Sequence, residues 1–147
     1  MESNKWKILQ TYKIRDDMYS GIVLKLYSKL QDDKTKFIID INQFSIGNHI
    51  LGSISIGEYE TGFLCDSLRF GYWPKLPTFY RYKKNRLLKI AWLPQALVIS
   101  ITDSKLEETS YIRITSDNES SVVKALMSFL KVIKIKNKIT DFSMDCI

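Results

Sequence analysis

Hydrophobic and polar residues alternate along most of the chain, with the period of two that is typical of β-strands. In residues 5–15 the even positions carry four apolar side chains: Trp6, Ile8, Tyr12 and Ile14. The odd positions of the same segment carry four basic ones: Lys5, Lys7, Lys13 and Arg15. The alternation returns in residues 22–29, 37–41 and 50–56. These segments predict half-buried strands of an antiparallel sheet, each with one apolar face.

The same alternation predicts further strands over residues 63–70, 78–84, 86–93, 96–102 and 111–115. Pro74 and Pro77 interrupt the series, because proline lacks the backbone donor that a central strand requires, and an exposed loop is expected over residues 71–77. The two residues Pro94 and Gln95 suit a tight reversal between strands. We expect the resulting hairpin of residues 86–102 to form the centre of the core.

Only one segment changes to the helical spacing of three and four residues. Its apolar positions are Val122, Val123, Leu126, Phe129, Leu130 and Ile133. Ser116 followed by Glu119 has the form of a capping box, which marks the start of a helix. The pattern predicts an amphipathic helix over about residues 117–135, and the C-terminal tail of residues 136–147 shows no usable pattern.

At 147 residues and 45% hydrophobic content, the chain is long enough for one well-filled core and short for two. No internal repeat or linker is recognisable. The sequence therefore predicts one domain over residues 1–147, of the α+β class and mainly β. The expected architecture is a strongly twisted antiparallel sheet or partly closed barrel of about 7–9 strands, with one C-terminal amphipathic helix packed on it.

The charge is unevenly distributed. The chain has 22 Lys and Arg against 16 Asp and Glu, a formal net charge of +6, and its sequence pI is near 9.2. Residues 67–102 contain no carboxylate but hold seven cations: Arg69, Lys75, Arg81, Lys83, Lys84, Arg86 and Lys89. Aromatic residues alternate with these cations: Phe70, Tyr72, Trp73, Phe79, Tyr80, Tyr82 and Trp92. This composition favours an anionic partner.

Catalytic chemistry has little support in the sequence, and we expect no enzyme. His49 is the only histidine and is interpreted as a surface residue at the start of a strand. Asp40 and Asp66 lie within apolar strand patterns, where a solvent-facing or hydrogen-bonded carboxylate is the simpler interpretation than an acid/base pair. Phosphate-loop, dinucleotide-binding and nucleophile-elbow motifs are absent from the sequence. No catalytic residue, metal ligand or cofactor is predicted.

The two cysteines, Cys65 and Cys146, have neither the spacing of a disulfide framework nor that of a metal site. The N-terminal segment has no apolar region followed by a cleavage site, and no apolar run approaches the roughly 20 residues of a membrane span. We therefore expect a soluble intracellular protein.

The segment Tyr111-Ile112-Arg113-Ile114-Thr115, followed by the predicted helix, resembles the last strand and helix of pleckstrin-homology-like domains. It is also similar to the end of Whirly-type single-strand-binding proteins, although the lysine-glycine-lysine-alanine motif of that family is missing. Each resemblance covers about a quarter of the chain, and the second implies binding of single-stranded nucleic acid.

The predicted function is non-enzymatic binding of single-stranded DNA or RNA, because cations hold phosphates while aromatic rings stack on unpaired bases. The candidate binding residues are Arg69, Tyr72, Trp73, Lys75, Tyr80, Arg81, Tyr82, Lys83, Lys84, Arg86 and Lys89. The alternative is an inhibitor, immunity-type protein or assembly subunit that binds an acidic protein, since Tyr, Trp and Arg also dominate protein interfaces. Either function is compatible with a homo-oligomer.

A specific arrangement follows from this interpretation. Arg81, Lys83, Lys84 and Arg86 should lie on one contiguous surface, with at least one of the rings of Tyr72, Trp73, Tyr80 and Tyr82 exposed beside them. Changing Lys83 and Lys84 to Glu should then abolish binding with little effect on stability. If that variant folds and still binds, the basic face of residues 5–15 is the next candidate surface.

Overall fold

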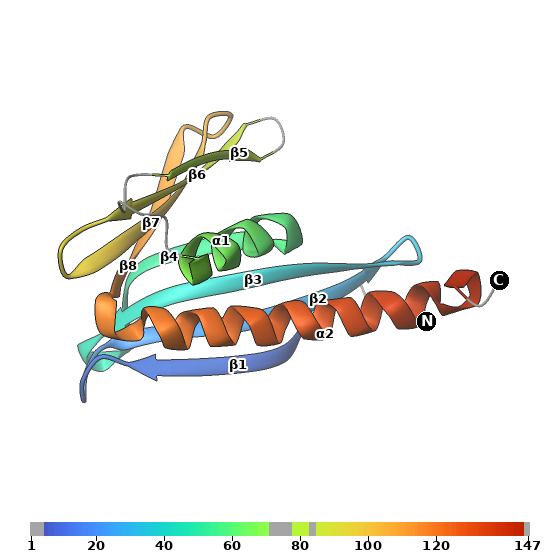
Figure 1. Cartoon of the computed structure of the whole chain (residues 1–147), viewed down its shortest axis with the longest axis horizontal. Coiled ribbons are helices and arrows are strands. Elements are labelled where there is room, and N and C mark those ends of the chain that lie inside the picture. Colours follow the sequence, from blue (N-terminus) through green and yellow to red (C-terminus); the bar gives the residue numbers. More distant parts are fainter. Residues whose placement is uncertain (1–4, 71–77, 83–84, 146–147) are drawn as a thin grey trace.

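The structure is a computed structural model that describes residues 5–70, 78–82 and 85–145, and it consists of two successive units of four strands and a helix (Figure 1). The first unit contains β1 (Lys7–Arg15), β2 (Gly21–Gln31), β3 (Lys34–Ser45), the short 3-10 helix η1 (Ile46–Asn48), β4 (His49–Gly57) and α1 (Glu58–Phe70). The second contains β5 (Thr78–Tyr82), β6 (Arg86–Trp92), β7 (Ala96–Asp103), β8 (Glu108–Thr115), η2 (Ser116–Asn118) and α2 (Glu119–Asp145).

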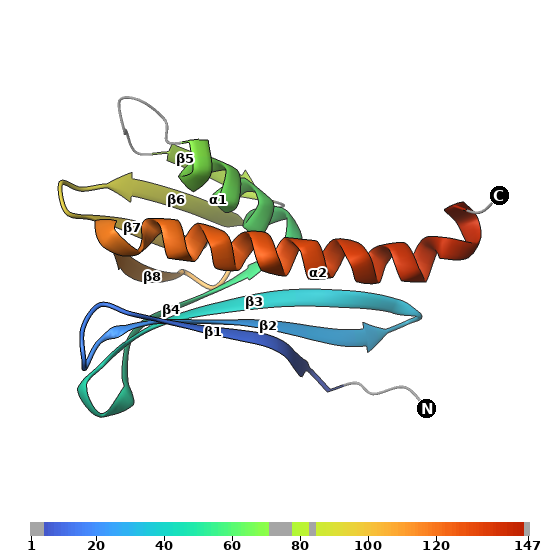
Figure 2. The same ribbon diagram turned by 60° about the horizontal axis from the view of Figure 1, so that its bottom comes forward.

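Each unit forms its own antiparallel sheet, with the strands in sequence order. The sheets meet where β8 passes over β4. At this crossing a Cβ added to Gly52 would lie only 2.3 Å from the carbonyl oxygen of Tyr111, so the close approach requires glycine. Nearby, the backbone N–H of Arg113 donates to Oε1 of Gln43 at 2.9 Å. Both helices lie on the side of the first sheet that faces the second sheet (Figures 1 and 2).

One hydrophobic cluster takes side chains from both sheets and both helices. The β-sheets supply mainly Ile and Leu, which suit a strand buried on one face: Ile22, Leu24, Leu26, Ile39, Ile41, Ile54, Ile56, Leu88, Ile90, Leu97, Ile99, Ile101, Ile112 and Ile114. The helices add Leu64, Cys65, Leu68, Val122, Ala125, Leu126, Phe129 and Ile133. The strong contribution of β6 and β7 confirms that the predicted hairpin lies in the core. Its turn is closed by the N–H of Leu93, which donates to the carbonyl of Ala96 at 2.7 Å.

The predicted fold class is confirmed at the level of α+β, mainly β, but its architecture is corrected. The strands form two separate sheets, not one sheet or a partly closed barrel. A repeat of element order is also present, although the two units share no recognisable sequence repeat. Alternation alone could not show this division, because it reports which side chains are buried within a strand and not which strands pair.

The strand predicted over residues 63–70 is wrong, because this segment belongs to α1. The buried positions of α1 have helical spacing, but half of them are polar: Glu60, Thr61, Leu64, Cys65, Ser67 and Leu68. An apolar pattern therefore could not reveal the helix. Its start is stabilised locally, since Oε1 of Glu60 accepts from the N–H of Gly57 at 3.2 Å and the Thr61 hydroxyl donates to the Gly57 carbonyl at 2.7 Å.

The predicted C-terminal helix is confirmed, and it extends into the segment that showed no pattern, ending at Asp145. At its start the N–H of Glu119 donates to the carbonyl of Ser116 within η2, in place of the expected capping box. The helix packs on β1, where the rings of Tyr12 and Phe129 have centroids 5.4 Å apart and the Tyr12 and Ser128 hydroxyls are 2.8 Å apart. Within the described part of the chain, no helix has the length and apolarity needed to cross a bilayer.

A β-bulge between Ile8 and Gln10 corrects the prediction that all apolar even positions of residues 5–15 share one face. After the bulge, Tyr12 and Ile14 face the helices. Before it, Ile8 pairs with Tyr27, whose position faces away from the core, so Trp6 and Ile8 remain 39% and 54% exposed. One extra residue in a strand reverses the face of every residue beyond it.

Candidate functional site

The face of the first sheet that points away from both helices is covered by no described element (Figure 2). We call it the open face. The β-sheet register assigns to it Ile8, Thr11, Lys13 and Arg15 of β1; Val23, Lys25, Tyr27, Lys29 and Gln31 of β2; Lys34, Lys36, Ile38, Asp40, Asn42 and Phe44 of β3; and Ile50, Ser53 and Ser55 of β4. Unlike the buried face, it is rich in cations and hydroxyl groups.

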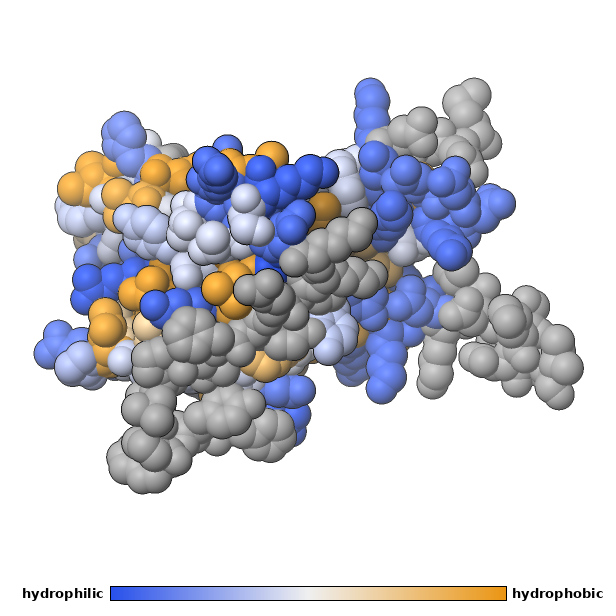
Figure 3. Space-filling view, turned by 90° about the horizontal axis from the view of Figure 1, so that it is seen from above, coloured by the Kyte–Doolittle hydropathy of each residue, from blue (hydrophilic) through white to orange (hydrophobic). Residues whose placement is uncertain are grey.

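Charge is segregated between the strands and the turns of the first sheet. Its strands contain the cations Lys7, Lys13, Arg15, Lys25, Lys29, Lys34 and Lys36, and one carboxylate, Asp40. The other acids of this region lie in the two hairpin turns: Asp16, Asp17, Asp32 and Asp33. Figure 3 shows hydrophilic residues gathered at the end of the molecule where the β2–β3 turn projects. The sheet surface itself is therefore strongly basic.

Two of the open-face cations are directly opposed. Lys29 of β2 pairs with Lys36 of β3 in the register, and like charges at opposed positions destabilise a sheet. Lys29 also places its Nζ 5.5 Å from the centroid of the Trp6 ring, a cation–π distance. An anionic ligand would relieve the repulsion between the two lysines.

Beside these lysines the open face is hollowed. The hollow has a volume of about 330 Å³ and is lined by Trp6, Tyr27, Ile38, Asp40 and Ser55. These residues come from the segment before β1 and from three adjacent strands, and they combine two aromatic rings, an aliphatic side chain, a hydroxyl and a carboxylate. Aromatic walls with a few convergent polar groups are typical of a site for a small planar group.

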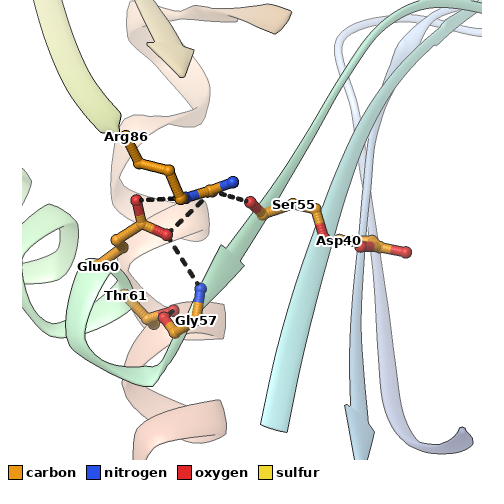
Figure 4. A network of polar contacts seen from close by, with 6 residues as sticks. All are labelled: Asp40, Ser55, Gly57, Glu60, Thr61 and Arg86. Carbon is orange, nitrogen blue, oxygen red and sulfur yellow. Dashed lines mark hydrogen bonds and ion pairs between the residues drawn. The ribbon is translucent and has the colours of Figure 1, made fainter. Parts of the chain in front are cut away.

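A partly buried polar network, which shares Ser55 with this hollow, joins the two sheets (Figure 4). Glu60 of α1 is only 1% exposed, and its carboxylate accepts two hydrogen bonds from Arg86 of β6, from Nε at 3.2 Å and Nη2 at 3.1 Å. The same Nη2 donates to the carbonyl of Ser55 at 2.7 Å. Such a two-point pair compensates for the cost of burying the carboxylate.

Ser55 connects this network to the open face. While its carbonyl accepts from Arg86, its hydroxyl donates to Oδ1 of Asp40 at 2.7 Å. In Figure 4 Asp40 and Ser55 lie side by side on adjacent strands. Ser55 thus connects the Asp40 carboxylate to the partly buried ion pair of Arg86 and Glu60.

The structure describes the side chains of only three of the predicted binding residues, Arg69, Arg86 and Lys89. Arg69 is exposed on α1, and Lys89 faces outward from β6. Arg86 forms an ion pair with Glu60, a carboxylate that lies outside the acid-free segment of residues 67–102. The remaining predicted residues have side chains outside the described set: Tyr72, Trp73, Lys75, Tyr80, Arg81, Tyr82, Lys83 and Lys84.

The backbone register of β5 is described. It places Tyr80 opposite Leu88, which is buried, and Tyr82 opposite Arg86. The contiguous surface of Arg81, Lys83, Lys84 and Arg86 stays a prediction, and so does the binding of phosphate by Arg86.

The candidate catalytic residues are dispersed. Asp40 lies on the open face, whereas Asp66 is exposed on α1, which packs on the opposite side of the first sheet. His49 is exposed at the start of β4. Burial raises the pKa of the Cys65 thiol, with a further contribution from the nearby Asp66 carboxylate, which favours the neutral thiol over the thiolate. Among the described residues, no group of three or more His, Cys, Asp or Glu side chains could hold a metal ion.

The hollow was not among the sequence predictions. The segregation of cations into strands and acids into turns was a usable signal, but the β1 bulge concealed the position of Trp6. The sequence matches no protein-family model and no curated protein. The function of the chain is therefore inferred from its own residues and geometry.

Proposed function

We propose that the chain is a non-enzymatic binding protein for single-stranded nucleic acid and that the open face of the first sheet is its principal binding surface. The observation that carries this proposal is the gathering of Lys13, Arg15, Lys25, Lys29 and Lys36 on one uncovered sheet face with the rings of Trp6 and Tyr27. Phosphates are bound by the cations, while unpaired bases stack on the rings.

Charge complementarity favours nucleic acid over an acidic protein at this surface. The cations are spread over three adjacent strands, as a flexible phosphate backbone requires, and the opposed Lys29 and Lys36 gain most from a ligand with closely spaced negative charges. The basic aromatic segment of residues 69–92 is proposed as a second surface for the same nucleic-acid strand, since two of its described cations, Arg69 and Lys89, lie outside the core.

Fluorescence anisotropy with labelled single-stranded DNA and RNA tests the proposal. We expect log affinity to fall linearly with log salt, with a slope of about −3.5 if each of Lys13, Arg15, Lys25, Lys29 and Lys36 neutralises one phosphate, and a shallower slope if fewer do. The double variant Lys25→Glu/Lys36→Glu should weaken binding by on the order of tenfold or more and flatten the slope. The control Lys124→Glu/Lys131→Glu carries the same change in net charge on exposed positions of α2.

Three outcomes separate the alternatives. Equal losses in both double variants would mean that binding follows net charge and not the open face. Absence of binding at low salt would overturn the proposal. A pull-down is the third measurement. If it recovers one acidic protein in stoichiometric amount, and nuclease treatment does not change the recovery, the protein-interaction function is supported instead.

A further inference from the structure

The hollow of the open face has a chemistry that distinguishes between bases. We infer that the hollow lined by Trp6, Tyr27, Ile38, Asp40 and Ser55 binds one unpaired base and selects guanine. This inference rests on the proposed binding of single-stranded nucleic acid and adds sequence preference to it.

The shape and lining of the hollow suit one base. Its volume of about 330 Å³ is at the lower end of the range for small-molecule sites, and a single base is smaller than most ligands of such sites. The rings of Trp6 and Tyr27 and the side chain of Ile38 offer flat or apolar surfaces for stacking. Lys29 lies over the Trp6 ring and belongs to the same basic surface, so a phosphate next to the stacked base has a cation within reach.

The polar end of the hollow is an acceptor. An ionised carboxylate has no donor, and the hydroxyl of Ser55 directs its proton to Oδ1 of Asp40. Among the described residues, Oδ2 of Asp40 makes no hydrogen bond, and each carboxylate oxygen can accept more than one. Asp40 lines the hollow, so both oxygens of its carboxylate can accept hydrogen bonds from a ligand there.

Guanine alone matches two adjacent acceptors. Its Watson–Crick edge carries two neighbouring donors, the N1 imino group and the N2 amino group, which pair with both oxygens of a carboxylate. Adenine and cytosine offer one amino donor beside an acceptor nitrogen, which would face the second carboxylate oxygen. Thymine and uracil offer one imino donor between two carbonyl groups. Asp40 is thus a specificity residue of the open face, and Ser55 and Arg86 position it.

The presence of a carboxylate on this basic surface agrees with this role. Asp40 is the one acid in the strands of the first sheet, and it lies opposite Lys25, within a field that attracts phosphates. A carboxylate there weakens nonspecific binding of a polyanion. If the carboxylate recognises a base, the weaker nonspecific binding is offset by tighter binding of the preferred sequence.

The test uses oligothymidine of roughly 12 nucleotides with one central guanine, hypoxanthine, adenine or thymine, titrated by anisotropy at one salt concentration. We expect guanine to bind about tenfold more tightly than thymine, with hypoxanthine, which lacks the amino group, in between. In Asp40→Asn the side-chain amide offers one donor and one acceptor, so the preference should move from guanine towards adenine. Because this variant also removes a repulsive charge, the ratio between oligonucleotides is the readout.

The outcomes distinguish this inference from the proposed function. If all four oligonucleotides bind the wild-type protein equally, the guanine site is overturned while nonspecific binding stands. If none binds, both are overturned. If guanine is preferred but Asp40→Asn keeps the preference, another residue reads the base and the assignment of Asp40 fails. The hypoxanthine comparison needs no protein variant, so the inference can be tested even if Asp40→Asn does not fold.

Discussion

The two ββββα units have the same order of elements, but the sheet faces that point away from the core differ in charge, as far as their side chains are described. The open face of β1–β4 carries Lys13, Arg15, Lys25, Lys29 and Lys36 beside one carboxylate, whereas the outward positions of β6–β8 are mostly neutral and include two cations, Lys89 and Arg113. Both sheets give their other face to the same core. The buried faces of both units are rich in Ile and Leu, and we infer that this shared pattern specifies the shared topology. The outward faces are not constrained by the core, so they can differ in charge and in function.

The largest expected effect concerns the ion pair that joins the two units. Arg86→Met leaves the buried Glu60 carboxylate without its partner, and we expect it to lower the free energy of unfolding by about 3 kcal/mol, near the lower end for a buried pair because Arg86 is partly exposed. Urea denaturation measures the loss. Arg113→Met is the matched control, on an exposed position of β8, and should cost less than about 0.5 kcal/mol.

A double variant sharpens this test. Glu60→Gln replaces the charge by a neutral amide, so adding it to Arg86→Met should recover part of the lost stability. If Arg86→Met unfolds no more easily than the control, the pair does not hold the units together.

The second effect concerns the crossing of the two sheets. Gly52→Ala would place a methyl group 2.3 Å from the Tyr111 carbonyl oxygen, and both backbones would have to move apart. We expect a loss of about 2 kcal/mol, measured by urea or thermal unfolding. Gly57→Ala on the same strand is the control, because its added Cβ meets nothing within 4 Å. Equal effects of the two changes would contradict the close contact of β4 and β8.

The third prediction compares nucleic-acid binding by the open face of the first sheet with binding by the outward face of the second. Lys89→Glu/Arg113→Glu on the second sheet should weaken binding of single-stranded nucleic acid much less than Lys25→Glu/Lys36→Glu on the first, about threefold or less against on the order of tenfold or more. Anisotropy at matched salt gives both values, since the two variants change the net charge equally. A larger loss on the second sheet would move the principal surface to that side and favour the segment of residues 69–92.

The smallest effect concerns the helix that ends the first unit. Gly62 lies within α1, and a Cβ added there meets nothing within 4 Å. Gly62→Ala should therefore raise the free energy of unfolding by about 0.5–1 kcal/mol, through the lower helix propensity of glycine. Thermal unfolding followed by circular dichroism measures the gain. A loss of stability would argue against a helix in this segment.

The sequence by itself determined which residues are buried in most strands and where the C-terminal helix lies. The alternation in residues 22–29 and 96–102 and the helical spacing of Val122, Leu126 and Phe129 each reflect a face buried against one core. Such local periodicity survives because burial within an element depends on the residues of that element. The cations of the first sheet were also visible, although their shared face was not.

Other features of the fold and the site are visible only in the tertiary structure. Residues 63–70, expected as a strand, belong to α1, because its buried Glu60, Thr61 and Ser67 conceal the helical period of apolar residues. Glu60 is tolerated there only because Arg86, 26 positions away, supplies its charge partner. The bulge in β1 moved Trp6 to the open face, and pairing of β2, β3 and β4 brought Tyr27, Asp40 and Ser55 beside it. These features depend on contacts between elements distant in sequence, which no local pattern records.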